Sequence, residues 1–157
     1  MEILLLITAS LFIIYNVFIL YNFGVPESLS ETSYLLKEKY KQPWWFSLVC
    51  VIIIIGLLPN WIIISTINTQ FLVFIACVGV LFIAASPFFL KGLDKPVHYT
   101  SGVVTAVCFI LWFIFNGQCI WLMYILLFFI PLIVWKPKCF IYFIEIIAYI
   151  FVILFLI

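Results

Sequence analysis

The sequence predicts an all-α polytopic membrane protein, a six-helix transmembrane bundle with one short interfacial helix. Of its 157 residues 69% are apolar and 8% are charged, whereas about a quarter of the residues in a soluble domain are charged. The apolar residues form six separate stretches, each near the roughly 20 residues that a helix needs to cross a hydrocarbon core of about 30 Å. We therefore expect residues 1–157 to form a single transmembrane domain with the lipid bilayer as its partner.

The six expected spans follow one another with hydrophilic breaks between them. They cover residues 3–23, 44–64, 71–90, 97–115, 119–135 and 139–157. The fifth is the shortest and contains Pro131, and its length is near the lower limit for a helix that spans a bilayer. Because few residues remain outside these stretches, we expect no soluble domain.

The lysines predict the orientation of the spans. All seven basic residues are lysines, and they lie in the first, third and fifth breaks: Lys37, Lys39, Lys41, Lys91, Lys95, Lys136 and Lys138. Odd-numbered loops of a bundle share one side, and basic loops stay in the cytoplasm. We therefore expect a multi-pass protein of the cell membrane with both termini outside the cytoplasm. A net charge of +1 gives no indication of nucleic-acid binding.

The tryptophans give a second indication of where the spans end. Indole side chains prefer the interface between membrane and water. Those expected on the lysine side are Trp44, Trp45 and Trp135, and those expected on the other side are Trp61, Trp112 and Trp121. This placement predicts an aromatic belt at both membrane surfaces.

The first break is long enough to hold a helix of its own. Ser28 and Glu31 form an S-x-x-E capping box, in which each side chain accepts a free amide at the helix start, so we expect an interfacial helix over about 29–41. Leu29, Leu36 and Tyr40 would form its apolar stripe, with lysines extending beside it. Such a helix would serve either as a connector between two spans or as a lid or partner-docking surface.

Glu145 is the acidic residue expected inside a span, and it is the first candidate for a site. It lies six residues after Cys139, which places it about 9–10 Å below the inner end of the last span. Because a charged group in hydrocarbon is costly, we expect Glu145 to face the interior of the bundle, near Asn16 or near the face that His98 and Ser101 share.

Further polar side chains fall in the same inner half of the expected bundle. They are Asn16, Asn22, Ser47, His98, Ser101 and Thr105. Together with Glu145 they predict a polar pocket that opens toward the cytoplasm between the first, fourth and sixth spans. The pocket would bind or transport a lipid or small hydrophobic molecule, with Glu145 as its polar anchor or proton carrier.

An alternative assigns these side chains to hydrogen bonds that hold helices together, in a structural, accessory or oligomeric membrane component without a ligand. No cofactor is expected. His98 is the one histidine, and a zinc site needs three or four protein ligands, so we expect no metal. The five cysteines show no CxxC or metal-ligand spacing.

Two resemblances accompany these residues. Residues 24–34 (GVPESLSETSY), Ala84-Ala85-Ser86-Pro87 and Val97-His98-Tyr99 resemble a group of small six-span membrane proteins of Bacteroidetes-type bacteria and their phages, which implies the fold and no activity. The chain is more distantly similar to the alkaline ceramidase and adiponectin-receptor-like superfamily of multi-span hydrolases. That similarity implies roles for Ser101, His98 and Asp94 in an intramembrane hydrolase, a second alternative. The paired histidines that this superfamily carries later in its sequence have no counterpart here.

Overall fold

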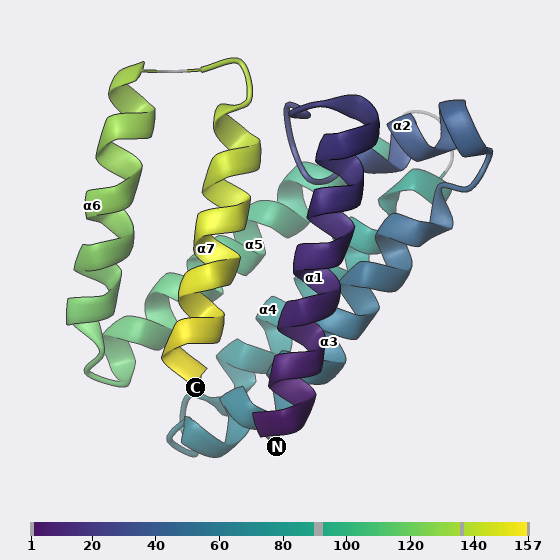
Figure 1. Cartoon of the computed structure of the whole chain (residues 1–157). Coiled ribbons are helices and arrows are strands. Elements are labelled where there is room, and N and C mark those ends of the chain that lie inside the picture. The colour runs from purple at the N-terminus through teal and green to yellow at the C-terminus, as the bar shows by residue number, and fades with distance from the viewer. Residues whose placement is uncertain (1, 90–92, 136, 157) are drawn as a thin grey trace.

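The computed structural model describes residues 2–89, 93–135 and 137–156, and in these ranges the chain is helical apart from short turns and links, with no strand (Figure 1). The elements are α1 (Glu2–Phe23), α2 (Glu31–Tyr40), α3 (Trp44–Ile64), α4 (Gln70–Ala85), the 3₁₀ turn η1 (Ser86–Phe88), α5 (Asp94–Phe115), α6 (Cys119–Trp135) and α7 (Phe140–Leu156). The prediction of an all-α chain is confirmed.

Four of the apolar helical segments are long enough to cross a membrane by length and composition: Ile3–Phe23, Trp44–Ile64, Gln70–Phe88 and Asp94–Phe115. These segments suggest a membrane protein. Helices α6 and α7 are equally apolar but have 17 residues each, which gives a length of about 26 Å at 1.5 Å per residue. Their role as a fifth and a sixth span therefore stays a prediction.

Most helix ends agree with the expected ones to within one residue, and three differ by more. Helix α5 begins at Asp94 rather than at residue 97, because an acidic residue favours a helix start and Pro96 costs no helical hydrogen bond in the first turn. Helix α4 ends at Ala85 and continues as the 3₁₀ turn that contains Pro87; the expected end at residue 90 lies outside the described residues. Helix α2 begins at Glu31 rather than at residue 29.

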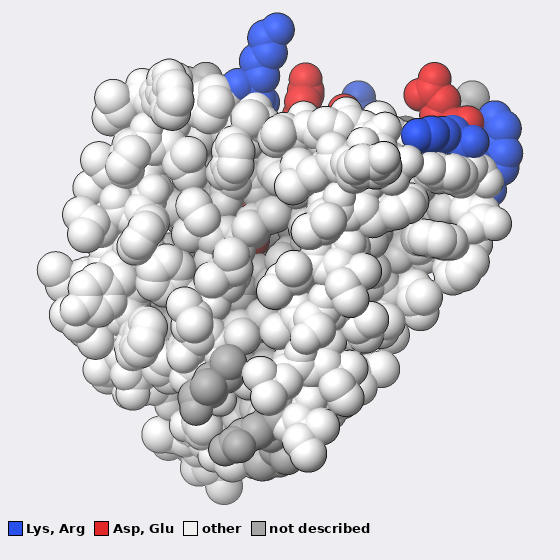
Figure 2. All heavy atoms as spheres, in the orientation of Figure 1, with Lys and Arg blue, Asp and Glu red and all other residues white. Residues whose placement is uncertain are grey.

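The molecule has two distinct ends (Figure 1). One, which we call the terminal end, carries the start of α1, the end of α7 and the links 65–69 and 116–118. The other, which we call the loop end, carries residues 24–43, including α2, and residues 137–139 just before α7. Figure 2 shows the blue and red side chains gathered along the edge of the loop end. The described parts of the first and fifth breaks, which carry Lys37, Lys39, Lys41 and Lys138, thus lie at the same end of the molecule, and the orientation of that end in a membrane stays a prediction.

Small residues allow neighbouring helices to approach closely. A Cβ atom at Gly56 of α3 would collide with the side chain of Thr8 in α1, and a Cβ atom at Gly79 of α4 would collide with that of Thr105 in α5. Close approach of backbones at small residues is the main way in which helices pack within membranes. Helix α6 is packed much less, and Ile125 is its one buried residue.

Two tryptophans of the expected aromatic belt lie near helix ends, as expected, but face the interior of the protein. Trp61 and Trp112 are buried and pack edge to face, with ring centroids 5.5 Å apart. Both belong to the core of the terminal end. The indole N–H of Trp112 donates to the hydroxyl oxygen of Ser65 at 2.7 Å, so it has a hydrogen-bond partner inside the protein. A satisfied indole N–H removes the reason for the ring to lie at the membrane surface. Trp44, Trp45 and Trp135 are exposed.

Candidate functional site

The start of α7 is bonded to the segment that connects α1 and α2. The backbone N–H of Tyr142 donates to the carbonyl oxygen of Glu27 at 3.0 Å, and the Tyr142 hydroxyl donates to Asn16 Oδ1 at 2.8 Å. One turn further along α7, Glu145 Oε2 accepts the backbone N–H of Leu29 at 2.7 Å. Residues three positions apart lie on the same face of a helix, so one face of α7 bonds both α1 and the residues just before α2.

Glu145 is half-buried and bonded to protein, as its cost in hydrocarbon predicts. Its described partner is a backbone amide at the approach to α2, a group that sequence reasoning does not single out. Asn16 belongs to the same set of contacts through Tyr142, whereas the described bond of His98 is to a different element. Whether Glu145 also contacts a ligand or carries a proton stays a prediction.

The first turn of α2 is held by buried polar contacts. Tyr15 of α1 and Thr32 of α2 share a hydrogen bond between their hydroxyl groups. One bond of the expected capping box is present, because Ser28 Oγ accepts the N–H of Glu31 at 3.1 Å. The box as a whole is not formed, because Ser30 rather than Ser28 precedes the helix and the Glu31 carboxylate accepts the N–H of Glu27 rather than that of Ser28. The carboxylate therefore holds the preceding turn of the link rather than the helix start itself.

The last turn of α2 is held against the end of α1 by one amide side chain. Asn22 Oδ1 accepts both the Tyr40 hydroxyl at 2.8 Å and Lys39 Nζ at 3.1 Å. The ammonium group of Lys39 also lies 5.1 Å from the ring centroid of Phe23 and 5.4 Å from that of Tyr40, within the range of a cation–π interaction. Lys41 then ends the helix in the left-handed conformation, with φ of 60°.

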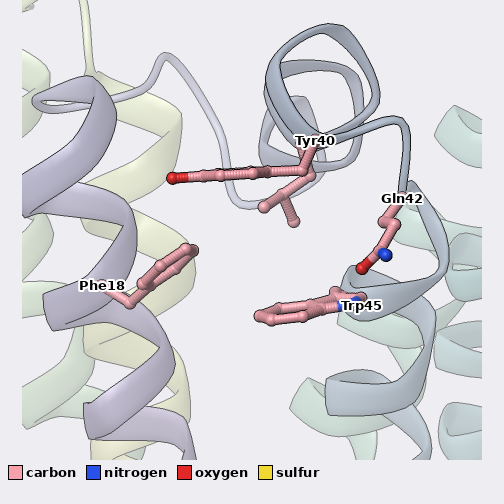
Figure 3. Close-up of a pocket in the computed structure, with 5 residues that line it drawn as sticks. Phe18, Tyr40, Gln42 and Trp45 are labelled. Atoms are coloured by element: carbon pink, nitrogen blue, oxygen red, sulfur yellow. The ribbon is translucent and has the colours of Figure 1, made fainter.

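A hollow of about 210 Å³ lies beneath this last turn. It is lined by Phe18, Leu36, Tyr40, Gln42 and Trp45. Figure 3 shows three rings around the space: Phe18 from α1, Tyr40 from α2 and Trp45 from α3. The ring centroid of Phe18 is 6.0 Å from that of Tyr40 and 5.9 Å from that of Trp45. The hollow is thus mainly aromatic, with the amide of Gln42 as its polar lining group. We call it the α2 hollow.

The remaining sequence candidates lie where α3, α4 and α5 meet. Ser47 Oγ donates to the carbonyl oxygen of Ala84 at 2.6 Å, and Thr105 Oγ1 donates to that of Ala76 at 3.3 Å. His98 Nδ1 is 3.3 Å from Ser86 Oγ. These bonds join neighbouring helices, as the alternative of a purely structural role predicts.

The seven candidates therefore fall into three groups: Asn16 and Glu145 near the start of α2; Asn22 at its end; and Ser47, His98, Ser101 and Thr105 beside α4. Residues that line the α2 hollow are absent from the set, although Asn22 positions one of them, Tyr40.

A histidine beside a serine also occurs in hydrolytic sites, but here His98 and Ser86 form a contact between α5 and the turn η1. Ser86 is buried, and its hydroxyl also donates to the carbonyl oxygen of Ile83 at 2.8 Å, so its proton is held by the backbone of its own helix. Throughout ranges 2–89, 93–135 and 137–156, no three His, Cys, Asp or Glu side chains lie close enough together to hold a metal ion. All five cysteines are free thiols.

Sequence reasoning missed the aromatic and hydroxyl residues that build the loop end: Tyr15, Phe18, Thr32, Trp45 and Tyr142. Tyrosine and phenylalanine count as apolar in a hydropathy pattern, so residues that line a hollow do not differ there from residues that face lipid. One signal was present. Thr32 and Leu36 are four residues apart in the sequence, the spacing of residues that share one face of a helix. Both are buried in the structure, so this is the face of α2 that packs inward.

No family model matches the chain, and neither a curated protein nor a solved structure is significantly similar to it.

Proposed function

We propose that this chain is a six-span protein of the cell membrane, with both termini outside the cytoplasm, and that it binds a lipid or small hydrophobic molecule in the α2 hollow. The hollow is the observation that supports this function. Its volume of about 210 Å³ is below the roughly 300–1,000 Å³ of pockets that enclose a whole drug-sized ligand. It would therefore accept one acyl chain or one ring, while the rest of the molecule stays in the bilayer.

The surroundings of the hollow fit an amphipathic ligand. Aromatic rings supply large apolar contact areas, and three of them surround the space. Trp44 and Trp45 form the first turn of α3, and lysines occupy the neighbouring end of α2. Tryptophan and lysine at a helix end are typical of the membrane interface. A ligand in the hollow would have its apolar part among the rings and its polar part near the lysines.

Helix α2 acts in this proposal as a lid over the hollow. Its first turn is held by Tyr15 and by the contact between Glu145 and Leu29, and its last turn provides Leu36 and Tyr40 to the hollow. Glu145 would then act as the anchor of the lid. A change at Glu145 would alter ligand binding through the position of α2.

Photo-crosslinking tests the binding function. The protein would be placed in lipid nanodiscs that contain a phospholipid with a photoreactive acyl chain, and crosslinked peptides would be mapped by mass spectrometry. We expect crosslinks in the peptides that contain Phe18 and Trp45. Gln42→Trp should fill the hollow and remove them, whereas Gln42→Ala should retain them. Crosslinks that are equally strong in both variants would contradict ligand binding in the hollow.

Reporter fusions test the topology. A reporter that is active only in the cytoplasm should give a strong signal when it is inserted after Lys39 and no signal when it is fused after the last residue. This result follows from the positive-inside rule applied to the lysine-bearing loops. The reverse pattern would place the loop end outside the cytoplasm and would overturn the proposed orientation.

A structural or accessory role is the second candidate, because most of the described polar side chains bond between elements. Contacts of this kind are worth about 0.6 kcal/mol each in membrane proteins. In that case the crosslinks at Phe18 and Trp45 would be no stronger than those at lipid-facing residues such as Tyr21, which is largely exposed, and substitutions of polar residues would change stability alone.

A further inference from the structure

We infer that the occupant of the α2 hollow is an anionic phospholipid, with one acyl chain against the rings of Phe18 and Trp45 that line the hollow and its phosphate at Lys39. This inference rests on the proposed function, because it names the class of lipid that the same hollow would take. Three features of the described residues support it: a cation at the edge of the hollow, a local excess of positive charge, and the orientation of α3.

The first feature is the position of the Lys39 ammonium group. It lies 5.4 Å from the ring centroid of Tyr40, and that ring lines the hollow. An ammonium group has three donor protons. The described acceptors are two oxygens of the same residue, Asn22 Oδ1 at 3.1 Å and the Asn22 carbonyl oxygen at 3.5 Å. Because Lys39 is exposed, a phosphate oxygen can approach its remaining proton and form a charge-assisted hydrogen bond.

The second feature is the charge around the end of α2. Lys37, Lys39 and Lys41 lie there together with Glu38, so three positive charges face one negative charge. The other acidic residues of this segment, Glu27 and Glu31, lie at the opposite end of α2, where Glu31 holds the N–H of Glu27. Positive charge is therefore concentrated beside the hollow, and it complements an anionic headgroup better than a zwitterionic one. Basic residues at a membrane surface contribute about 1 kcal/mol each toward anionic lipid.

The third feature is the direction of α3. The start of a helix carries a partial positive charge from its free amides, and Trp45 places the first turn of α3 beside the hollow. In the described part of the chain this first turn contains no acidic residue and has no capping side chain. The start of α3 therefore offsets the partial negative charge that the ends of α1 and α2 bring to the same place, and the positive charge of the lysines remains in excess. The aromatic lining then favours a phosphate that carries an acyl chain over free phosphate.

Competition between two lipids tests this inference. The protein would be reconstituted in nanodiscs that contain equal amounts of photoreactive phosphatidylglycerol, which is anionic, and phosphatidylcholine, which is zwitterionic. Crosslinks at the Phe18 and Trp45 peptides would be counted for each lipid. We expect phosphatidylglycerol to be preferred about fivefold, the ratio that about 1 kcal/mol gives.

Variants at one position separate charge from packing. Lys39→Gln should reduce the preference to less than half of its original value while the total crosslinking at the hollow persists, and Lys39→Arg should retain the preference. Lys95→Gln removes an exposed lysine in the first turn of α5 and should leave the preference unchanged. Inorganic phosphate at millimolar concentration should not reduce the crosslinks.

The outcomes distinguish failure of the inference from failure of the proposed function. Equal crosslinking of both lipids in the unchanged protein would overturn the inference, and so would a preference that is undiminished in Lys39→Gln or that falls equally in Lys95→Gln. Displacement by inorganic phosphate would show an anion site without a lipid requirement and would also overturn it. Crosslinks that do not depend on Gln42→Trp would instead overturn binding in the hollow itself.

Discussion

The two ends of the molecule are held together in different ways. At the terminal end, Trp112 donates to Ser65 Oγ at 2.7 Å, and Ser65 Oγ donates to the carbonyl oxygen of Trp61 at 2.6 Å. These polar contacts are covered by packed indole rings. At the loop end, the polar contacts connect distant parts of the chain, such as α7 to α1 and α7 to the residues before α2, and a hollow remains beside them.

This difference separates what stabilises the fold from what can change shape. Packing of large buried side chains contributes several kcal/mol per residue, whereas a hydrogen bond between membrane helices contributes about 0.6 kcal/mol. We therefore expect the terminal end to determine the free energy of unfolding. The loop end should determine the free energy of local opening, which is usually smaller in segments that carry function.

The largest effect is expected at Trp112. Its side chain is 1% exposed, so Trp112→Ala leaves a cavity, removes contacts with several aromatic rings and should lower the free energy of unfolding by about 3–5 kcal/mol. Denaturant unfolding in detergent, followed by circular dichroism, measures this change. Trp135→Ala is the control, because Trp135 is 82% exposed and should have little effect. Equal losses in both variants would show that the core of the terminal end does not determine stability.

A large local effect is expected at Leu36. Its side chain is fully buried beneath α2, so Leu36→Asp would place an unpaired charge on the packed face, which is costly. Helix α2 should detach, and amide hydrogen exchange over residues 31–41 should become fast while α3 and α5 stay protected. Tyr34→Asp, at an exposed position of the same helix, should leave the exchange slow. Detachment in both variants would mean that charge alone displaces α2.

The helices were predictable because the sequence has six apolar segments, and a chain in lipid would have to satisfy its backbone hydrogen bonds within each of them, which leaves the helix as the available structure. The bounds of α3 and α6 agree residue for residue with the expected ones. The high cost of a carboxylate in hydrocarbon likewise predicts that Glu145 contacts protein. Its partner was not predictable, because the N–H of Leu29 is a backbone group that every residue except proline carries and has no sequence signature.

The α2 hollow was not predictable for a related reason. Phe18 lines it while Tyr21, three residues later, is largely exposed, and hydropathy does not distinguish such neighbours. The hollow depends on the angle at which α1, α2 and α3 meet. That angle follows from contacts such as Tyr15 with Thr32 and Tyr40 with Asn22. The sequence alone does not indicate which of its residues form these pairs.

An intermediate effect is expected at Glu145. Glu145→Ala removes the acceptor of the Leu29 N–H, and such a hydrogen bond is worth about 1 kcal/mol when the acceptor is neutral and up to about 3 kcal/mol when it is charged. Amide exchange of residues 27–33 should accelerate by one to two orders of magnitude, about the factor that this free energy gives. Glu145→Gln keeps an acceptor oxygen and should show a smaller change. If both variants exchange at the original rate, Glu145 does not hold α2.

The smallest effect is expected at Tyr142, and Tyr149, a second buried tyrosine of α7, provides the comparison. Tyr142→Phe removes the hydroxyl that donates to Asn16 and leaves the backbone bond to Glu27 in place, so the free energy of unfolding should fall by about 0.6 kcal/mol. Within the described residues, the Tyr149 hydroxyl is buried without a hydrogen-bond partner. A buried polar group without a partner costs free energy, so Tyr149→Phe should leave stability unchanged or raise it slightly. Parallel unfolding titrations of both variants measure the difference. A loss at Tyr149 as large as that at Tyr142 would show that the ring positions, rather than the bond between α7 and α1, determine how firmly the loop end is held.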